Sequence, residues 1–182
     1  MKLTLSQVKH VANRVAIELN QSEMVTMTHG LEPVALEVEK VLEIDIKNEL
    51  ELDEKVNLIV DDNEEQIDFM LADERQLFYM IKKKLAAEAG VILSYEERFS
   101  DIAHKVLDEL YEEDLIHYDV NENRIKNIIY TAMTGFVADA SEIENAVIDK
   151  IYTYKKRYIP GTDEYNILFD KLYAEELQKR GF

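Results

Sequence analysis

Cysteine is absent from this chain of 182 residues, and glycine and proline are scarce, with only five and two copies. The lack of cysteine excludes disulfides, thiolate-bound zinc and cysteine nucleophiles. An all-β domain needs turn residues about every 8–12 positions, and glycine and proline are too few here to supply them. The chain is instead rich in helix formers such as glutamate, lysine, leucine and alanine, so its composition predicts an all-α protein.

Long hydrophobic runs are also missing. No apolar stretch approaches the ~18 residues of a transmembrane helix, so we expect no membrane partner. The N-terminal sequence MKLTLSQVKHVANRV lacks the apolar segment of about 7–15 residues that a secretory signal needs. Because the absence of cysteine also fits a reducing compartment, we expect a soluble cytoplasmic protein.

Positive charge is the minority sign. Thirty-eight Asp and Glu residues oppose 21 Lys and Arg residues, and the formal net charge is −17. Phosphate contacts dominate affinity for nucleic acid, so this balance argues against nucleic-acid binding unless basic side chains gather on one face. The chain has two short basic clusters that are candidates for such a face, Lys82–Lys84 and Lys155–Arg157.

Sequence motifs for catalysis and for metal binding are missing as well. The four histidines do not pair at i, i+4, no HExxH motif occurs, and no glycine-rich loop could cradle a phosphate. The segment that starts at Asp119 begins like a calcium loop, but Arg124 replaces the glycine of the sharp turn and Tyr130 the bidentate glutamate. We therefore expect no cofactor, no metal site and no enzymatic activity.

The two halves of the chain resemble each other when one is shifted by 91 positions. Apolar positions then coincide without a gap through four expected helices: Val15 with Val106, Leu19 with Leu110, Val34 with Ile125, Val38 with Ile129, Leu52 with Ile143, Val56 with Val147, Val60 with Ile151, Leu77 with Leu168 and Ile81 with Leu172. Gly90 coincides with Gly181. A chance match of amphipathic helices is the alternative, but the constant offset favours an internal duplication. We predict two units, residues 1–90 and 91–182.

The expected fold is all-α, with two tandem helical modules of about four helices each. In the second unit, Ser94-x-x-Glu97 and Ser141-x-x-Glu144 are capping boxes, which predict helix starts. Gly135 predicts a helix end before the second of these starts, and Pro160-Gly161 predicts another. Thr162 is the expected N-cap of the last helix. The first unit repeats this pattern more loosely.

The tail of the second unit carries a distinctive motif. It consists of Lys156-Arg157, Pro160, Gly161-Thr162, Glu164-Tyr165, Leu168-Phe169, Lys171, Tyr173, Glu175-Glu176-Leu177 and Lys179-Arg180-Gly181. With the segments DIAHKVLDEL and DLIHY before it, this tail resembles the bacterial family known as domain of unknown function 507, whose members usually have an acidic residue between the proline and the glycine. The resemblance covers the whole chain when the first unit is taken as a diverged copy. It implies a small all-helical bacterial protein and no established activity, cofactor or catalytic residue.

Candidate partner-binding residues are Lys155, Lys156, Arg157, Tyr158 and Tyr165. The simplest interpretation is structural: the cations end a helix, where they meet its dipole favourably, and the tyrosines form a core edge. The leading functional hypothesis is a non-enzymatic cytoplasmic interaction or scaffold module whose partner is a protein, with self-association as an option. The alternative hypothesis is nucleic-acid binding through this basic patch, since tyrosine, arginine and lysine can stack on bases and contact phosphate.

Overall fold

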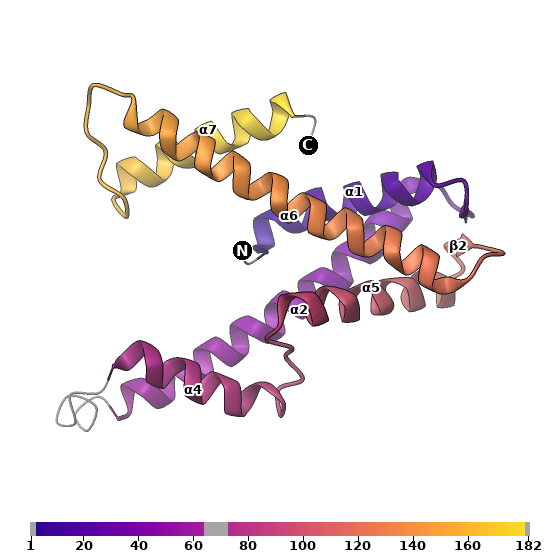
Figure 1. The fold of residues 1–182 in the computed structure, drawn as a ribbon, viewed down its shortest axis with the longest axis horizontal. Coiled ribbons are helices and arrows are strands. Elements are labelled where there is room, and N and C mark those ends of the chain that lie inside the picture. Colours follow the sequence, from indigo (N-terminus) through magenta and orange to yellow (C-terminus); the bar gives the residue numbers. More distant parts are fainter. Residues whose placement is uncertain (1–2, 64–72, 181–182) are drawn as a thin grey trace. The chain divides into compact units, whose positions relative to one another are not determined.

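The computed structural model describes residues 3–63 and 73–180. Contacts divide this part of the chain into an N-terminal unit, residues 3–133, and a C-terminal unit, residues 134–180. Each unit is built from helices, and the strands of the described residues are only two residues long (Figure 1). The predicted all-α fold is confirmed.

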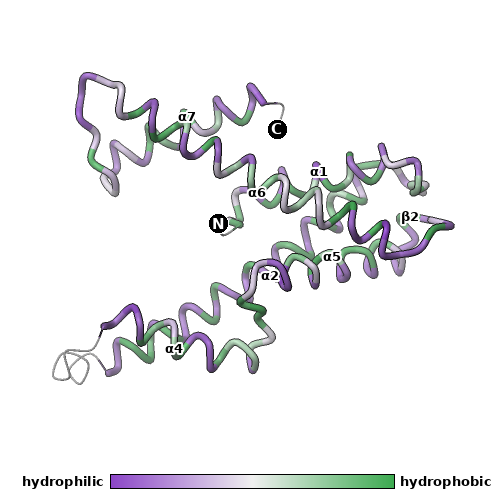
Figure 2. Tube along the Cα trace, viewed as in Figure 1, coloured by the Kyte–Doolittle hydropathy of each residue, from purple (hydrophilic) through white to green (hydrophobic). Residues whose placement is uncertain are grey.

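The N-terminal unit is centred on the long helix α2, Leu31–Asp61. The helices α1, Val8–Gln21, and α5, Tyr95–Glu112, both pack against it. Their apolar residues recur at three- and four-residue spacing, which gathers them on one face. In α5 the buried apolar residues are Phe99, Ile102, Ala103, Val106, Leu107 and Leu110. Figure 2 shows the alternation of apolar and polar residues along the helices.

The remaining elements of this unit are short or continue beyond it. The 3-10 helix η1, Leu5–Gln7, precedes α1, and the first part of α6, Glu122–Tyr152, belongs to this unit. The strand β1, Thr26–Met27, pairs antiparallel with β2, Ile116–His117. This ribbon lies just after α1 and just after α5, so it brings the ends of two helices together that are far apart in the sequence.

The second half of α2 forms a hairpin with α4, Glu74–Ala86, which we call the α2–α4 arm. Asp73 begins α4, and its carboxylate accepts hydrogen bonds from the N–H groups of Arg75 and Gln76 at 2.9 and 3.3 Å. Apolar burial holds the two helices together. The buried residues are Leu52, Val56, Val60, Ala86 and Val91, with Leu77, Phe78, Ile81, Leu85 and Ala89 packed against them.

The C-terminal unit is a second hairpin, made of α6 from Thr134 onward and α7, Asp163–Lys179, which we call the α6–α7 arm. Thr162 caps α7 as predicted, because its hydroxyl accepts a hydrogen bond from the N–H of Tyr165 at 3.4 Å. The predicted terminal glycine, Gly181, lies outside the described residues. The buried core is Ile143, Val147, Ile151, Leu172 and Leu177, with Tyr158, Tyr165, Leu168, Phe169 and Tyr173 packed against it.

Two sequence predictions about helix boundaries are wrong. Helix α6 continues through Gly135 and Ser141, and α2 is likewise one continuous helix from Leu31 to Asp61. The described residues therefore form six α-helices and not about four per module. A glycine inside a helix costs about 1 kcal/mol relative to alanine. The adjacent Phe136 is fully buried, and burial of such a side chain contributes roughly 1.5–3 kcal/mol, which outweighs that cost. Ser94 is the N-cap residue of α5, but its side chain makes no capping hydrogen bond.

The offset of 91 positions recurs in the structure. Helices α2 and α6 begin at Leu31 and Glu122 and end at Asp61 and Tyr152, so both of their boundaries differ by 91. Packing, however, does not follow the predicted boundary near residue 90, because β1 pairs with β2 and α5 packs on α2. The duplication and its two units therefore stay a prediction about the sequence.

Candidate functional site

The predicted basic cluster lies in the connection between α6 and α7. The sequence predicted that residues 155–157 form the last turn of a helix, and this prediction is wrong: helix α6 ends at Tyr152, so the three cations follow it. The helix ends there because both the hydroxyl and the N–H of Thr153 donate to the carbonyl of Lys150, at 2.6 and 3.1 Å. The three cations are therefore presented by a loop, and all three are exposed.

Lys156 is the cation that this loop holds in place. Its ammonium group lies 2.6 Å from a carboxylate oxygen of Glu164 and 5.3 Å from the ring centroid of Tyr158. The hydrogen bond and the charge of Glu164 raise the pKa of Lys156 above its ordinary value. Lys155 and Arg157 make no ion pair with any described residue, so their charges are available to a partner.

The tyrosines near the cluster divide into two groups. Tyr158 and Tyr165 are half-buried against the core of the α6–α7 arm. Tyr165 stacks on Phe169, with ring centroids 6.2 Å apart, and Phe169 stacks on Tyr173 at 5.8 Å. Two of the predicted site residues therefore form a core edge, which was the structural interpretation of the sequence.

Exposed aromatic side chains accompany the cations. Tyr152 is 68% exposed and Tyr154 is 42% exposed, and the ring of Tyr154 meets that of Tyr158 edge-on at 6.2 Å. Together with residues 155–157 they line an open hollow of about 270 Å³. We call residues 152–160 the basic corner. It brings together four of the five predicted residues, and Tyr165 lies in the stack beside it.

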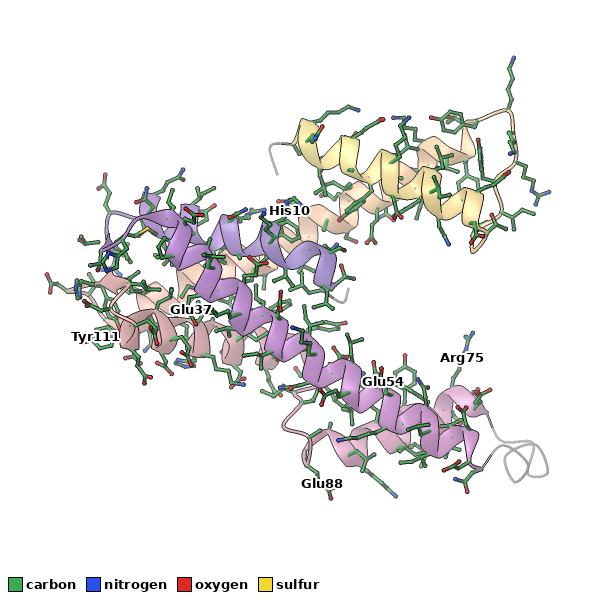
Figure 3. The ribbon with its side chains drawn as sticks, turned by 180° about the vertical axis from the view of Figure 1, so that it is seen from behind. His10, Glu37, Glu54, Arg75, Glu88 and Tyr111 are labelled. Atoms are coloured by element: carbon green, nitrogen blue, oxygen red, sulfur yellow. The ribbon has the colours of Figure 1, made fainter. Side chains whose placement is uncertain are left out.

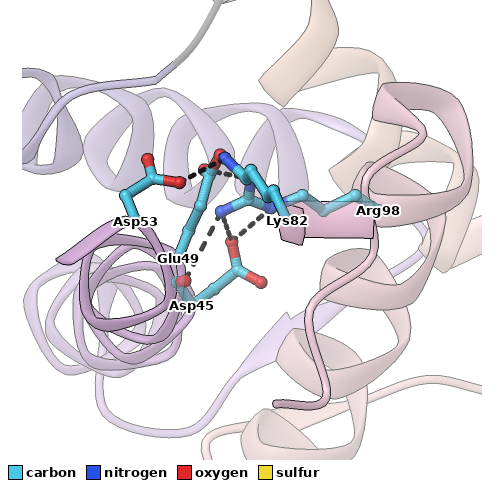
Figure 4. A network of polar contacts seen from close by, with 5 residues as sticks. All are labelled: Asp45, Glu49, Asp53, Lys82 and Arg98. Carbon is cyan, nitrogen blue, oxygen red and sulfur yellow. Dashed lines mark hydrogen bonds and ion pairs between the residues drawn. The ribbon is translucent and has the colours of Figure 1, made fainter. Parts of the chain in front are cut away.

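A buried charge network in the N-terminal unit was missed by the sequence analysis (Figure 4). Arg98 of α5 donates through Nε to Asp45 at 2.7 Å and through Nη1 to Glu49, and both acceptors lie on α2. Lys82 of α4 donates to Glu49 at 2.8 Å and lies 2.6 Å from Asp53. The side chains of Lys82 and Arg98 are each only 11% exposed. The network thus ties three helices together.

Electrostatics keeps both network cations charged. Burial is the largest effect on Lys82 and lowers its pKa, but hydrogen bonds and charges from Asp53 and Glu49 outweigh it, so that the pKa is raised. Asp45 and Glu49 act in the same way on the pKa of Arg98. We interpret the network as a structural junction between the three helices. Removal of one charged partner would leave the opposite charges buried without compensation, which is costly.

This network changes the interpretation of the first basic cluster. Lys82 is buried in an ion-paired junction, whereas Lys83 and Lys84 are exposed. The cluster therefore does not present three cations on one face. A signal was present in the sequence, because Glu49 occupies a buried position of α2 between Ile46 and Leu52, where the helical pattern calls for an apolar residue.

Residues 3–63 and 73–180 contain neither a candidate membrane-spanning helix nor a cluster of metal-binding side chains. No helix in these ranges is long and apolar enough to cross a membrane. Nor does this part of the chain contain a group of three histidine, aspartate or glutamate side chains arranged to hold a metal ion.

Comparison with known proteins gives a family but no activity. No curated protein matches the chain. The model of the family described as "Protein of unknown function (DUF507)" matches residues 1–182. The match spans the whole chain, so the resemblance of the tail is confirmed, and the chain belongs to this family.

Proposed function

We propose that this protein is a non-enzymatic interaction module of the bacterial cytoplasm that binds a protein partner through the basic corner. The observation that carries the proposal is a group of exposed tyrosines and unpaired cations around one hollow, in a loop where Lys156 pairs with Glu164. Tyrosine and arginine are enriched among the residues that dominate binding energy at protein interfaces.

A protein partner fits the corner better than a nucleic acid does. One of its three cations is already neutralised by Glu164, and Asp163 lies next to that residue. The chain as a whole carries a net charge of −17, and repulsion of a phosphate backbone would act over about 8 Å even at physiological salt. A protein segment with one acidic side chain among apolar ones carries far less negative charge than a phosphate backbone, so it would meet Lys155 and Arg157 with less of that repulsion.

Affinity capture of the tagged full-length protein from its own cell lysate at low salt, with and without nuclease, tests this proposal. We expect partner proteins that resist nuclease and that are lost from the double variant Lys155→Glu, Arg157→Glu. The matched control is Lys83→Glu, Lys84→Glu, which makes the same charge change on exposed residues of α4. Loss of every partner on nuclease treatment would instead favour nucleic-acid binding, and equal loss from both variants would contradict a role for the corner.

A further inference from the structure

A second open hollow lies in the N-terminal unit, where the ribbon brings the ends of α1 and α5 together. Its volume is about 520 Å³. Figure 3 shows Tyr111, one of its lining residues, at the end of α5. The polar and aromatic residues of its lining are Glu23, Thr26, Tyr111, His117, Tyr118 and Asp119.

The aromatic part of this hollow is a pair of tyrosines. Tyr111 is 58% exposed, so a face of its ring is accessible to a ligand. Its ring centroid lies 5.8 Å from that of the half-buried Tyr118, and the two ring planes are tilted by 56°. The faces of tyrosine rings carry partial negative charge and attract cations within about 6 Å.

The charged part of the hollow is acidic. Glu23 and Asp119 contribute exposed carboxylates, and the lining contains no lysine or arginine. The Nε2 atom of His117 lies 3.1 Å from Asp114, so the histidine has a carboxylate neighbour of its own. A ligand in this hollow would therefore meet two carboxylates that no lysine or arginine of the lining neutralises.

Two helix ends strengthen this negative potential. Helices α1 and α5 both end beside the hollow, and neither has a basic residue in its last turn. The C-terminus of a helix carries roughly half a negative charge. Burial is the largest cause of a raised pKa at Tyr118, and interactions with Glu122, Tyr111 and Asp108 raise that pKa further.

Two acidic residues after these helices adopt a left-handed backbone conformation, which glycine adopts at lower energetic cost. Glu23 and Asp114 follow α1 and α5 and adopt φ values of +56° and +55°. This left-handed conformation costs a non-glycine residue on the order of 1 kcal/mol, and a negative side chain at a helix C-terminus is unfavourable. Acidic residues thus follow both helix ends although the helix dipole disfavours negative charge there.

We propose that this hollow binds the guanidinium group of an arginine side chain from a partner protein. A guanidinium is planar and weakly hydrated, so it can lie on a tyrosine face while its N–H groups donate to carboxylates. Tyr111 supplies the exposed face, and Glu23 and Asp119 supply the carboxylates. The site is separate in sequence and in chemistry from the basic corner, so it stands or fails independently of the function proposed above.

NMR titration of the full-length protein, labelled with ¹³C on tyrosine, tests the site. The probes are three blocked tripeptides, acetyl-Gly-X-Gly-amide, in which X is arginine, lysine or the neutral isostere citrulline. We expect saturable shifts of Tyr111 and Tyr118 with the arginine probe, with a Kd of roughly 1 mM. Binding of the lysine probe should be about threefold weaker, and citrulline should not saturate.

Charge-neutralising variants localise the binding. Asp119→Asn and Glu23→Gln should each weaken the arginine probe about fivefold. Glu88→Gln, an exposed glutamate after α4 that Figure 3 labels, makes the same charge change and should leave the affinity unaltered. The proposal is overturned if citrulline binds as well as arginine, if Glu88→Gln weakens binding as much as Asp119→Asn, or if no probe saturates. Equal affinity for arginine and lysine would overturn the preference for a guanidinium.

Discussion

The two arms share a pattern of apolar core positions. They differ at the positions that form the charge network in the α2–α4 arm, when these are compared with the equivalent positions of the α6–α7 arm. In the α2–α4 arm this level carries Glu49 and Lys82, which are buried and ion-paired. The residues 91 positions later are Ala140, which is buried, and Tyr173, which stacks on Phe169. Both arms have apolar cores, but at this level the α2–α4 arm is joined by buried charges and the α6–α7 arm by apolar and aromatic contacts.

This difference matters because the two kinds of junction respond differently to change. A buried ion pair contributes little net stability, since desolvation offsets most of the attraction, but removal of one partner is costly. Aromatic contacts contribute through buried area and ring geometry. We infer that the charges fix the orientation of α4 and α5 on α2, whereas the aromatic stack supports the loop that forms the basic corner.

The largest expected effect is that of Arg98→Met. This change leaves Asp45 and Glu49 without their guanidinium partner, so it should lower the free energy of unfolding by about 3 kcal/mol. Urea unfolding followed by circular dichroism measures the loss. The matched control is Arg75→Met on the exposed side of α4 (Figure 3), which should change stability by less than about 0.5 kcal/mol. Similar values for both variants would show that the network has no structural role.

The stability of the α6–α7 arm should be less sensitive to the truncation of a single side chain. Phe169→Ala removes both stacking contacts, but the ring is only half-buried, so we expect a loss of about 2 kcal/mol by urea unfolding. Phe169→Leu keeps most of the apolar volume and should lose about half as much. A larger loss than that of Arg98→Met would reverse the order that the two junctions predict.

A residue swap sharpens the comparison. The variant Asp45→Phe, Glu49→Ala, Lys82→Tyr, Arg98→Gln places in the charged junction the residues found 91 positions away. Because this variant removes four of the five network charges together and keeps only Asp53, it should lose less stability than the single change Arg98→Met. A fourfold variant that loses more free energy of unfolding than Arg98→Met would contradict this interpretation.

The smallest effect is a dependence on pH. The pKa of Lys82 is raised in the folded state, so its stabilising contribution is complete below the unfolded-state value of about 10.4 and is lost as the pH rises through the folded-state value. The difference in free energy of unfolding between the wild type and Lys82→Met should therefore be constant from about pH 7 to 9 and shrink above about pH 10.4. A difference that shrinks near neutral pH would contradict the raised pKa.

The sequence predicted those features that depend on neighbouring residues. Helical periodicity identified the apolar faces of both arms, Thr162 was recognised as a cap, and the cations of the basic corner were found by their local density. The features that were missed depend on distant residues. Arg98 meets α2 across 53 positions of sequence, and strands of two residues, such as β1 and β2, are too short to show an alternating pattern.

The most direct test of the proposed function is site-specific photo-crosslinking in living cells. A photoreactive phenylalanine analogue would replace Tyr152 at the basic corner, or Tyr79 of α4 as the control, two tyrosines that are 68% and 69% exposed. The proposal predicts a discrete protein adduct from position 152 and none of that mass from position 79. An adduct of equal yield at both positions, an adduct to nucleic acid, or no adduct at position 152 would contradict it.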